Sequence, residues 1–219
     1  MPTYTPIKHQ IASLYSEVEA HGWATGTIDI HHLISWSSHF GWDQVSNRRN
    51  AGDVDQLVPL TESDARPNSL SAKHGLRRQP LHTDGAHLRR PPDLIALSAK
   101  YASPTPTLLW KPGHPPTYAF HGVFLVNDGV DRFLTTSYSM HDGFRYDAGC
   151  MVPCDQRARD TAKLYAEGES SATIHEWTSA DELLLIDNRR VLHARDALAP
   201  DDHRRVLERV SFQIRTHHV

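Results

Sequence analysis

The sequence has little cysteine and lacks any long apolar run. Only Cys150 and Cys154 occur among 219 residues, which excludes a framework of several disulfides. A C-x3-C pair can bind metal in principle, but without a second pair two ordinary thiols are the preferred interpretation. No stretch reaches the length of a membrane span, and no apolar signal segment opens the chain. We therefore expect a cytoplasmic protein with no membrane partner.

An excess of charge of one sign is also missing. The chain carries 23 Lys and Arg against 26 Asp and Glu, a formal net charge of −3. Its arginine pairs are scattered, so no basic stripe indicates a nucleic-acid partner. Internal repeats and low-complexity tracts are absent, and no change of composition marks a domain boundary. The length suits one well-buried domain, so we expect a single domain over residues 1–219.

Histidine is what the sequence has in abundance, with 16 residues. Two positions apart, His82 and Asp84 lie in a segment, residues 79–84, that reads as a strand. Side chains at this spacing project from the same face of a strand, so both can reach one metal ion. The composition predicts about two H-x-[DE] triplets by chance. The motif therefore needs support from the rest of the chain.

Two helices are predicted near the N-terminus, over residues 7–18 and 31–40, and a glycine follows each of them. A short strand over residues 23–28 separates them. The next segment, residues 42–71, is irregular, with one strand at most. Long loops are often functional, although an ordinary polar loop is the simpler interpretation here. We take Ser71 as a candidate substrate-binding residue. The polar residues that precede His82 and could line the mouth of a site are Asn68, Ser69, Ser71 and Lys73.

Strands dominate the remainder of the chain. Turn-forming Gly, Pro and Asn-Asp residues separate short apolar segments. One helix, predicted over residues 156–167 and capped by Asp155, interrupts this series of strands. Many short strands at regular spacing predict a sandwich or jelly roll. We therefore expect a mainly β fold with flanking helices, made of an N-terminal helical part (1–55) and a jelly-roll core (56–216). The predicted strands are 79–84, 93–101, 106–111, 117–126, 131–138, 172–177, 182–187, 190–195 and 205–215.

A third candidate metal ligand, His193, lies near the C-terminus. The segment 183–186 is apolar on both faces, which predicts a strand buried on both sides. After a tight turn, the next strand carries His193. A single histidine in such a water-poor place is more often an ordinary core residue than a ligand. Its combination with His82 and Asp84 is what gives it weight.

Two arginines share one face of the last predicted strand. Arg205 and Arg209 alternate with apolar residues of the other face, whereas Arg204 points away from them. The simpler interpretation is the solvated face of an edge strand. The functional interpretation is a pocket in which guanidinium groups bind anionic groups.

Together these residues fit one chemistry. Two histidines and one carboxylate leave positions open on a metal ion, which is the facial triad of non-haem Fe(II) oxygenases. Such iron commonly needs an electron-donating co-substrate. A dicarboxylate such as 2-oxoglutarate would chelate the iron at one end and need a cationic anchor at the other. Arg205, a dozen residues after His193, meets that need.

In these motifs the sequence resembles the taurine dioxygenase/clavaminate synthase-like family of Fe(II)- and 2-oxoglutarate-dependent oxygenases. The resemblance covers residues 56–216 and rests on the H-x-D pair in combination with residues 187–193 and 204–209. It implies a double-stranded β-helix, a cupin-like jelly roll with flanking helices.

The resemblance also implies roles for single residues. His82, Asp84 and His193 would bind iron. Arg205 and Thr107 would bind the distal carboxylate of 2-oxoglutarate, with Thr105 left open as the alternative to Thr107. Arg209 would bind an acidic group of the substrate.

The activity implied by the resemblance is O2-dependent hydroxylation of an unactivated C–H bond in a small, anionic or amino-acid-like substrate, with succinate and CO2 as co-products. Halogenating relatives replace the metal-binding carboxylate by a small residue, whereas this chain keeps Asp84. Desaturation and ring closure begin in the same way and stay open as alternatives. A cupin-like Zn or Mn hydrolase or isomerase would not need Arg205, and a non-catalytic jelly-roll binding module would turn the arginines to solvent. No pattern predicts the oligomeric state.

Overall fold

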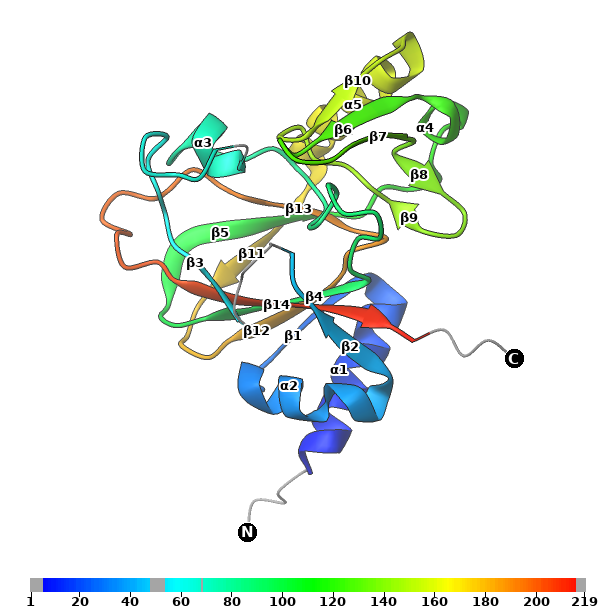
Figure 1. The fold of residues 1–219 in the computed structure, drawn as a ribbon. Helices are drawn as coiled ribbons and strands as arrows, with labels where there is room; N and C mark the ends of the chain where they lie inside the picture. Colours follow the sequence, from blue (N-terminus) through cyan, green and yellow to red (C-terminus); the bar gives the residue numbers. More distant parts are fainter. Residues whose placement is uncertain (1–5, 48–53, 68, 216–219) are drawn as a thin grey trace.

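Two facing antiparallel β-sheets form the centre of the fold (Figure 1). The computed structural model describes residues 6–47, 54–67 and 69–215. In the larger sheet the strand order is β1-β12-β4-β14-β2, with β3 paired to β14, and in the smaller sheet it is β11-β5-β13. This arrangement confirms the predicted mainly β, jelly-roll fold. The strands are β1 (Trp23–Gly26), β2 (Trp42–Val45), β3 (Asp55–Leu57), β4 (Leu94–Ala99), β5 (Ser103–Trp110), β11 (Thr173–Trp177), β12 (Leu183–Asp187), β13 (Leu192–Arg195) and β14 (Leu207–Ile214).

Strand β4 is buried on both faces and separates two hydrophobic cores. Ile95 packs with Leu109 of β5 in the core between the two sheets. Its neighbour Ala96 packs in a second core with Ile11 and Leu33, which come from the N-terminal helices. Because side chains alternate along a strand, one strand serves both cores, and its sequence is therefore continuously apolar.

Helices α1 (Ile7–His21) and α2 (Ile30–Ser37) cover the outer face of the larger sheet (Figure 1). Gly22 follows α1 with a φ of 101°, in the left-handed region that favours glycine. Asp29 caps α2 by accepting hydrogen bonds from two backbone N–H groups of its first turn. A 3-10 turn, η1 (Ser38–Phe40), extends α2 to a glycine. Both predicted helices are confirmed, and no helix in the described ranges is long and apolar enough to cross a membrane.

A further layer lies beside the smaller sheet, at the top of Figure 1. Its core contains Phe124 and Tyr165 and continues into Leu192 and Ala194 of β13, so it is packed directly on the smaller sheet. Asp155 caps its longer helix, as predicted. Its elements are α4 (Thr117–His121), β6 (Phe124–Asn127), β7 (Arg132–Thr135), β8 (Tyr138–Ser139), β9 (Gly143–Phe144), β10 (Met151–Pro153), α5 (Gln156–Gly168) and η2 (Glu169–Ser171).

The structure corrects the predicted strand over residues 79–84. This segment forms one isolated β-bridge, at His82, instead of a strand. Pro80 has no N–H group to donate to a ladder, and Gly85 turns the chain with a φ of 68°. The argument from strand alternation therefore does not apply to the H-x-D pair, and another cause must bring its side chains together.

Two other segments also differ from the prediction. Residues 117–126 begin with helix α4, whose first residue follows Pro116, and only their end is a strand. The segment 42–71 contains β2, β3 and a short helix, α3 (Leu70–His74), in place of at most one strand. Strand β2 forms because Trp42 is buried in the outer core and pairs with the end of β14. The predicted N-terminal helical part thus contributes β1 and β2 to the larger sheet.

Candidate metal site

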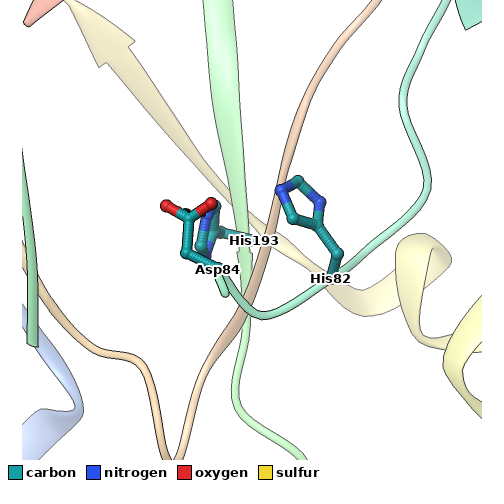
Figure 2. Close-up of side chains that lie close together, drawn as sticks. All are labelled: His82, Asp84 and His193. Carbon is teal, nitrogen blue, oxygen red and sulfur yellow. Dashed lines mark ion pairs between the residues drawn. The ribbon is translucent and has the colours of Figure 1, made fainter. Parts of the chain in front are cut away.

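Backbone pairing brings two histidines together (Figure 2). The N–H group of His82 donates to the carbonyl of His193 at 3.0 Å, and the reverse bond measures 2.9 Å. The centroids of their rings lie 4.7 Å apart. One histidine comes from the loop after α3 and the other from β13, so a contact across the fold replaces the predicted strand.

Asp84 reaches the two histidines from a tightly held turn. One residue earlier, Thr83 donates its N–H group to the carbonyl of Tyr146 at 2.7 Å and accepts from the Tyr146 N–H group at 3.0 Å. One residue later, a Cβ atom on Gly85 would lie only 2.6 Å from a carbon of Pro92. With its positive φ, this position therefore needs glycine.

The three side chains form a group with metal-ligand geometry. One ligand atom each from His82, Asp84 and His193 lies within 4.8 Å of the other two. In the described part of the chain, no other cluster of three or more His, Cys, Asp or Glu residues has this geometry. The C-x3-C pair supplies none, because Cys150 is buried and Cys154 is exposed.

Buried polar atoms of this group lack hydrogen-bond partners among the described residues. Asp84 and His193 are buried, and in the part of the chain that the structure describes no group forms a hydrogen bond with Oδ2 of Asp84. That oxygen lies 3.7 Å from Nε2 of His193, which is too far for a hydrogen bond. Nδ1 of His82 lies 3.0 Å from the carbonyl of Pro80 and can donate to it, which leaves Nε2 with a free lone pair. A divalent cation fits this donor set, because it would satisfy the buried carboxylate oxygen and both imidazoles.

The charges of the site favour metal-binding protonation states. Burial, followed by the nearby His193, lowers the pKa of His82 below its ordinary value, which favours the neutral imidazole. Burial alone would raise the pKa of Asp84, but the charge of Arg209 and the two imidazoles outweigh it, so this pKa lies below its usual range. The carboxylate therefore stays ionised.

Asn188 fastens the turn that carries Asp84. Its side-chain oxygen accepts from the N–H group of Asp84 at 2.8 Å, and its side-chain nitrogen donates to the carbonyls of Asp84 and Pro92 at 3.0 and 2.8 Å. It lies in the turn between β12 and β13 and is 1% exposed. The sequence interpretation gave this residue no role of its own. The only local signal is a polar residue placed between an apolar strand and a candidate ligand.

Replacing Asn188 by alanine is expected to weaken metal binding about 10- to 100-fold, the usual effect of losing a partner that orients a ligand. It should also lower the free energy of unfolding by about 1–3 kcal/mol, because three buried backbone groups lose their partner. Metal titration and chemical denaturation measure the two effects. The control Asn127→Ala removes an acceptor from an exposed hairpin turn and should change neither. Wild-type metal affinity in Asn188→Ala would contradict the role.

Arg209 contacts the site from near the start of β14. One terminal nitrogen donates to Oδ1 of Asp84 at 2.7 Å, and the other donates to Oδ2 of Asp55 at 2.7 Å. Its Nε is buried and has no hydrogen-bond partner within residues 6–47, 54–67 and 69–215. The simpler interpretation of these arginines, a solvated face of an edge strand, is wrong, because Leu207 and Ser211 are buried together with Arg209. A role in substrate binding stays a prediction, with Nε as the nitrogen left for it.

The guanidinium of Arg205 is buried. The residue is 4% exposed, and its side chain makes no hydrogen bond with the described residues. Burial, together with the charge of Arg195, lowers its pKa to about 10, and the carboxylate of Asp202 acts in the opposite direction. The group is thus charged at neutral pH. A buried guanidinium without a partner is unfavourable, and an anionic ligand would satisfy it.

The structure places the two candidate threonines in different surroundings. Thr105 donates its hydroxyl to Asp202 at 2.5 Å and accepts from the N–H group of Ala199. Thr107 accepts from the indole N–H group of Trp177 at 3.1 Å, which leaves its hydroxyl hydrogen to donate. It also lies opposite Arg195 in the pairing of β5 with β13. Of the two, Thr107 has the hydroxyl that can still serve a ligand.

The predicted mouth residues surround the short helix α3. Ser71 is half-buried and accepts from the side chain of Gln79 at 3.3 Å. Ser69 caps the helix, and Lys73 donates to two backbone carbonyls. Asn68 lies outside the described residues. These contacts tie α3 to its surroundings, and a role of Ser71 in substrate binding stays a prediction.

Comparisons with known proteins detect a relationship in structure only. No family model matches the sequence, and no curated protein matches it. Among solved structures, asparagine oxygenase in complex with Fe(II), 2S,3S-3-hydroxyasparagine and succinate has a TM-score of 0.71 over 94% of this chain and 78% of its own, at 15% identity. The chain has the fold of this oxygenase.

Two further solved structures share the fold. The non-haem iron oxygenase OrfP, in complex with Fe and alpha-ketoglutaric acid, has a TM-score of 0.68 and 15% identity, over 95% of this chain and 80% of its own. The PvcB protein from Pseudomonas aeruginosa has a TM-score of 0.62 and 14% identity, over 92% and 79%. At such identities the likeness establishes the fold, and the function has to be argued from the site.

Proposed function

We propose that this protein is an Fe(II)- and 2-oxoglutarate-dependent oxygenase of the taurine dioxygenase/clavaminate synthase-like family. The observation that carries the proposal is the pair of unsatisfied buried groups within one fold. Among the described residues, Oδ2 of Asp84 has no hydrogen-bond partner and lies close to two imidazoles, and the side chain of Arg205 makes no hydrogen bond. A ferrous ion and a dicarboxylate together would satisfy both.

In this proposal His82, Asp84 and His193 hold the iron. When bound, the ferrous centre supplies the coupled oxidation of 2-oxoglutarate to succinate and CO2 and of a substrate C–H bond by O2. The residues of the chain contribute binding and order. The two imidazoles are neutral donors, Asp84 brings one negative charge, and Asn188 and Arg209 keep that carboxylate in place.

Arg205 and Thr107 are proposed to bind the distal carboxylate of 2-oxoglutarate. The guanidinium is charged and buried and makes no hydrogen bond with the described residues, so a carboxylate would gain a strong charge-assisted contact there. Thr107 can add one hydroxyl donor. Arg205 and Arg209 are buried, at 4% and 9% exposure, which weighs against a binding module with solvated arginines. A cupin-like hydrolase would not need a buried cation at the position of Arg205.

For the substrate we propose a small amino-acid-like molecule, which Arg209, through Nε, and Ser71 would contact. The solved relatives support this class, since they hold 3-hydroxyasparagine in one case and (3S)-hydroxy-L-Arg in another.

Hydroxylation is the reaction we favour, because the carboxylate of Asp84 is kept at the metal. Desaturation and ring closure are the outcomes that product analysis would separate from it. The free thiols of Cys150 and Cys154 suit the cytoplasmic location that we propose.

Turnover is expected only when Fe(II), 2-oxoglutarate, O2 and a suitable amino acid are all present. A screen of amino acids and related small acids, read by succinate formation and by the mass of the product, tests this. A gain of 16 mass units indicates hydroxylation, and a loss of two indicates desaturation or ring closure. Hydrolysis supported by Zn or Mn without 2-oxoglutarate would overturn the proposal.

A further inference from the structure

Asp84 and Asp55 share one buried guanidinium. Arg209 donates to Oδ1 of Asp84 and to Oδ2 of Asp55 through different terminal nitrogens, each at 2.7 Å. The side chains are 10%, 8% and 13% exposed for Arg209, Asp84 and Asp55. The three groups form a continuous chain of charge-assisted hydrogen bonds that ends at a candidate metal ligand.

The sheet sets the position of Asp55. It is the first residue of β3 and lies directly opposite Arg209 in the pairing of β3 with β14. On its other side, Arg209 lies opposite Leu97 of β4, an apolar residue that cannot hold a guanidinium by hydrogen bonds. Within the described strands, Asp55 is therefore the cross-strand neighbour of Arg209 that can fix the far end of its side chain by a hydrogen bond.

Fixing this arginine has a consequence for the metal ligand. The terminal torsion of an aspartate is broad, so the carboxylate of Asp84 can rotate unless one oxygen is held. Arg209 holds Oδ1, which leaves Oδ2 directed at His193. A free arginine side chain has many rotamers, and Asp55 removes that freedom. The charges also favour metal binding. Two carboxylates and one guanidinium have a net charge of −1, which attracts a cation.

We infer that Asp55 is a positioning residue of the metal site, which acts through Arg209 to hold the Asp84 carboxylate in its metal-binding orientation. The inference rests on the metal site proposed above and does not depend on the reaction or on the substrate. Without Asp55, the guanidinium would lie beside Asp84 as a one-to-one ion pair. Such a pair is neutral, and it competes with the metal for the carboxylate.

Titration of the protein with Co(II), followed by its visible absorption, tests the inference. Asp55→Ala is expected to bind the ion about 10- to 100-fold more weakly and to show an altered visible spectrum, because the orientation of one ligand changes. Asp55→Asn keeps an acceptor for Arg209 but loses the charge. It should bind with intermediate affinity, and it provides a second variant if the alanine protein folds poorly.

The matched control is Asp43→Ala, which breaks an exposed ion pair between β2 and Arg215, the residue after the end of β14. It should leave both the affinity and the spectrum unchanged. Thermal unfolding of each apo variant shows whether the fold is intact. A loss of stability in Asp55→Ala with unchanged Co(II) binding would show that Asp55 is merely structural and would overturn the inference.

A double-mutant cycle decides whether Asp55 acts through the arginine. In an Arg209→Met background, adding Asp55→Ala should change the Co(II) affinity less than about twofold, because the connection is already broken. An effect as large as in the wild-type background would overturn the inference. His193→Ala corrects for binding elsewhere. If the wild-type protein binds no more Co(II) than His193→Ala, the metal site itself fails; if only the Asp55 variants behave like wild type, the inference alone fails.

Discussion

The variant His193→Ala is expected to lose specific metal binding and all measurable iron- and 2-oxoglutarate-dependent turnover. The loss should exceed the 10- to 100-fold that typically follows removal of a residue behind a ligand, because a ligand itself is lost. The backbone bridge to His82 does not involve the imidazole, so the fold should survive. Isothermal titration with Mn(II) or Co(II), together with the succinate assay, measures the two losses.

The chain offers a matched control for this experiment. His175 on β11 is another largely buried histidine near a carboxylate, with 9% of its side chain exposed and Nε2 at 3.6 Å from Glu182. Burial lowers its pKa as well. Because only two groups meet there, His175→Ala should keep wild-type metal binding. If His175→Ala and His193→Ala lost metal binding equally, the assignment of the site would be wrong.

The second prediction concerns Arg205. Replacing it should raise the stability of the apo protein but weaken the binding of 2-oxoglutarate. Arg205→Met should stabilise the apo protein by about 1–4 kcal/mol, because it replaces a buried, unpaired charge by an apolar chain of similar length. The same change should weaken 2-oxoglutarate binding by at least about 2 kcal/mol, or roughly 30-fold, since the buried carboxylate loses its charged partner. Metal affinity should stay as in the wild type.

Thermal unfolding with and without the co-substrate separates these effects. With Mn(II) present, 2-oxoglutarate should raise the unfolding temperature of the wild-type protein, as expected for a ligand that binds the native state. It should hardly change that of Arg205→Met. The neighbouring Arg204 is exposed, and Arg204→Met should behave like the wild type. A destabilised Arg205→Met protein that still responds to 2-oxoglutarate would refute the role of this residue.

The metal ligands of the site could be predicted from the sequence, because the types of residue that can bind a metal are visible there. His82, Asp84 and His193 were candidates on the basis of donor type, and the structure brings these three side chains within reach of one ion. The physical reason given for the first pair was nevertheless wrong, since residues 79–84 do not form a strand. A backbone bridge to His193, the contacts of Thr83 and the amide of Asn188 hold the ligands instead.

Periodicity and turn chemistry likewise predicted most elements, because helices α1, α2 and α5 and the apolar strands β4 and β12 express local rules. The prediction failed where tertiary contacts compensate for weak local preference. Strand β2 forms on the larger sheet through pairing with β14 and the burial of Trp42. Helix α4 replaces the start of a predicted strand after Pro116.

By itself, the sequence determined the fold class and the candidate ligands, and it predicted two arginines on one face of the last strand. In the structure Arg209 lies on β14, whereas Arg205 precedes the first residue of that strand, Leu207. Only the tertiary structure decided what those arginines contact. Arg205 is buried without a partner, whereas Arg209 is shared between Asp84 and Asp55. Asp55 lies 154 positions from Arg209 in the chain, and no local pattern predicts such a pair, because sheet pairing across the whole fold creates it.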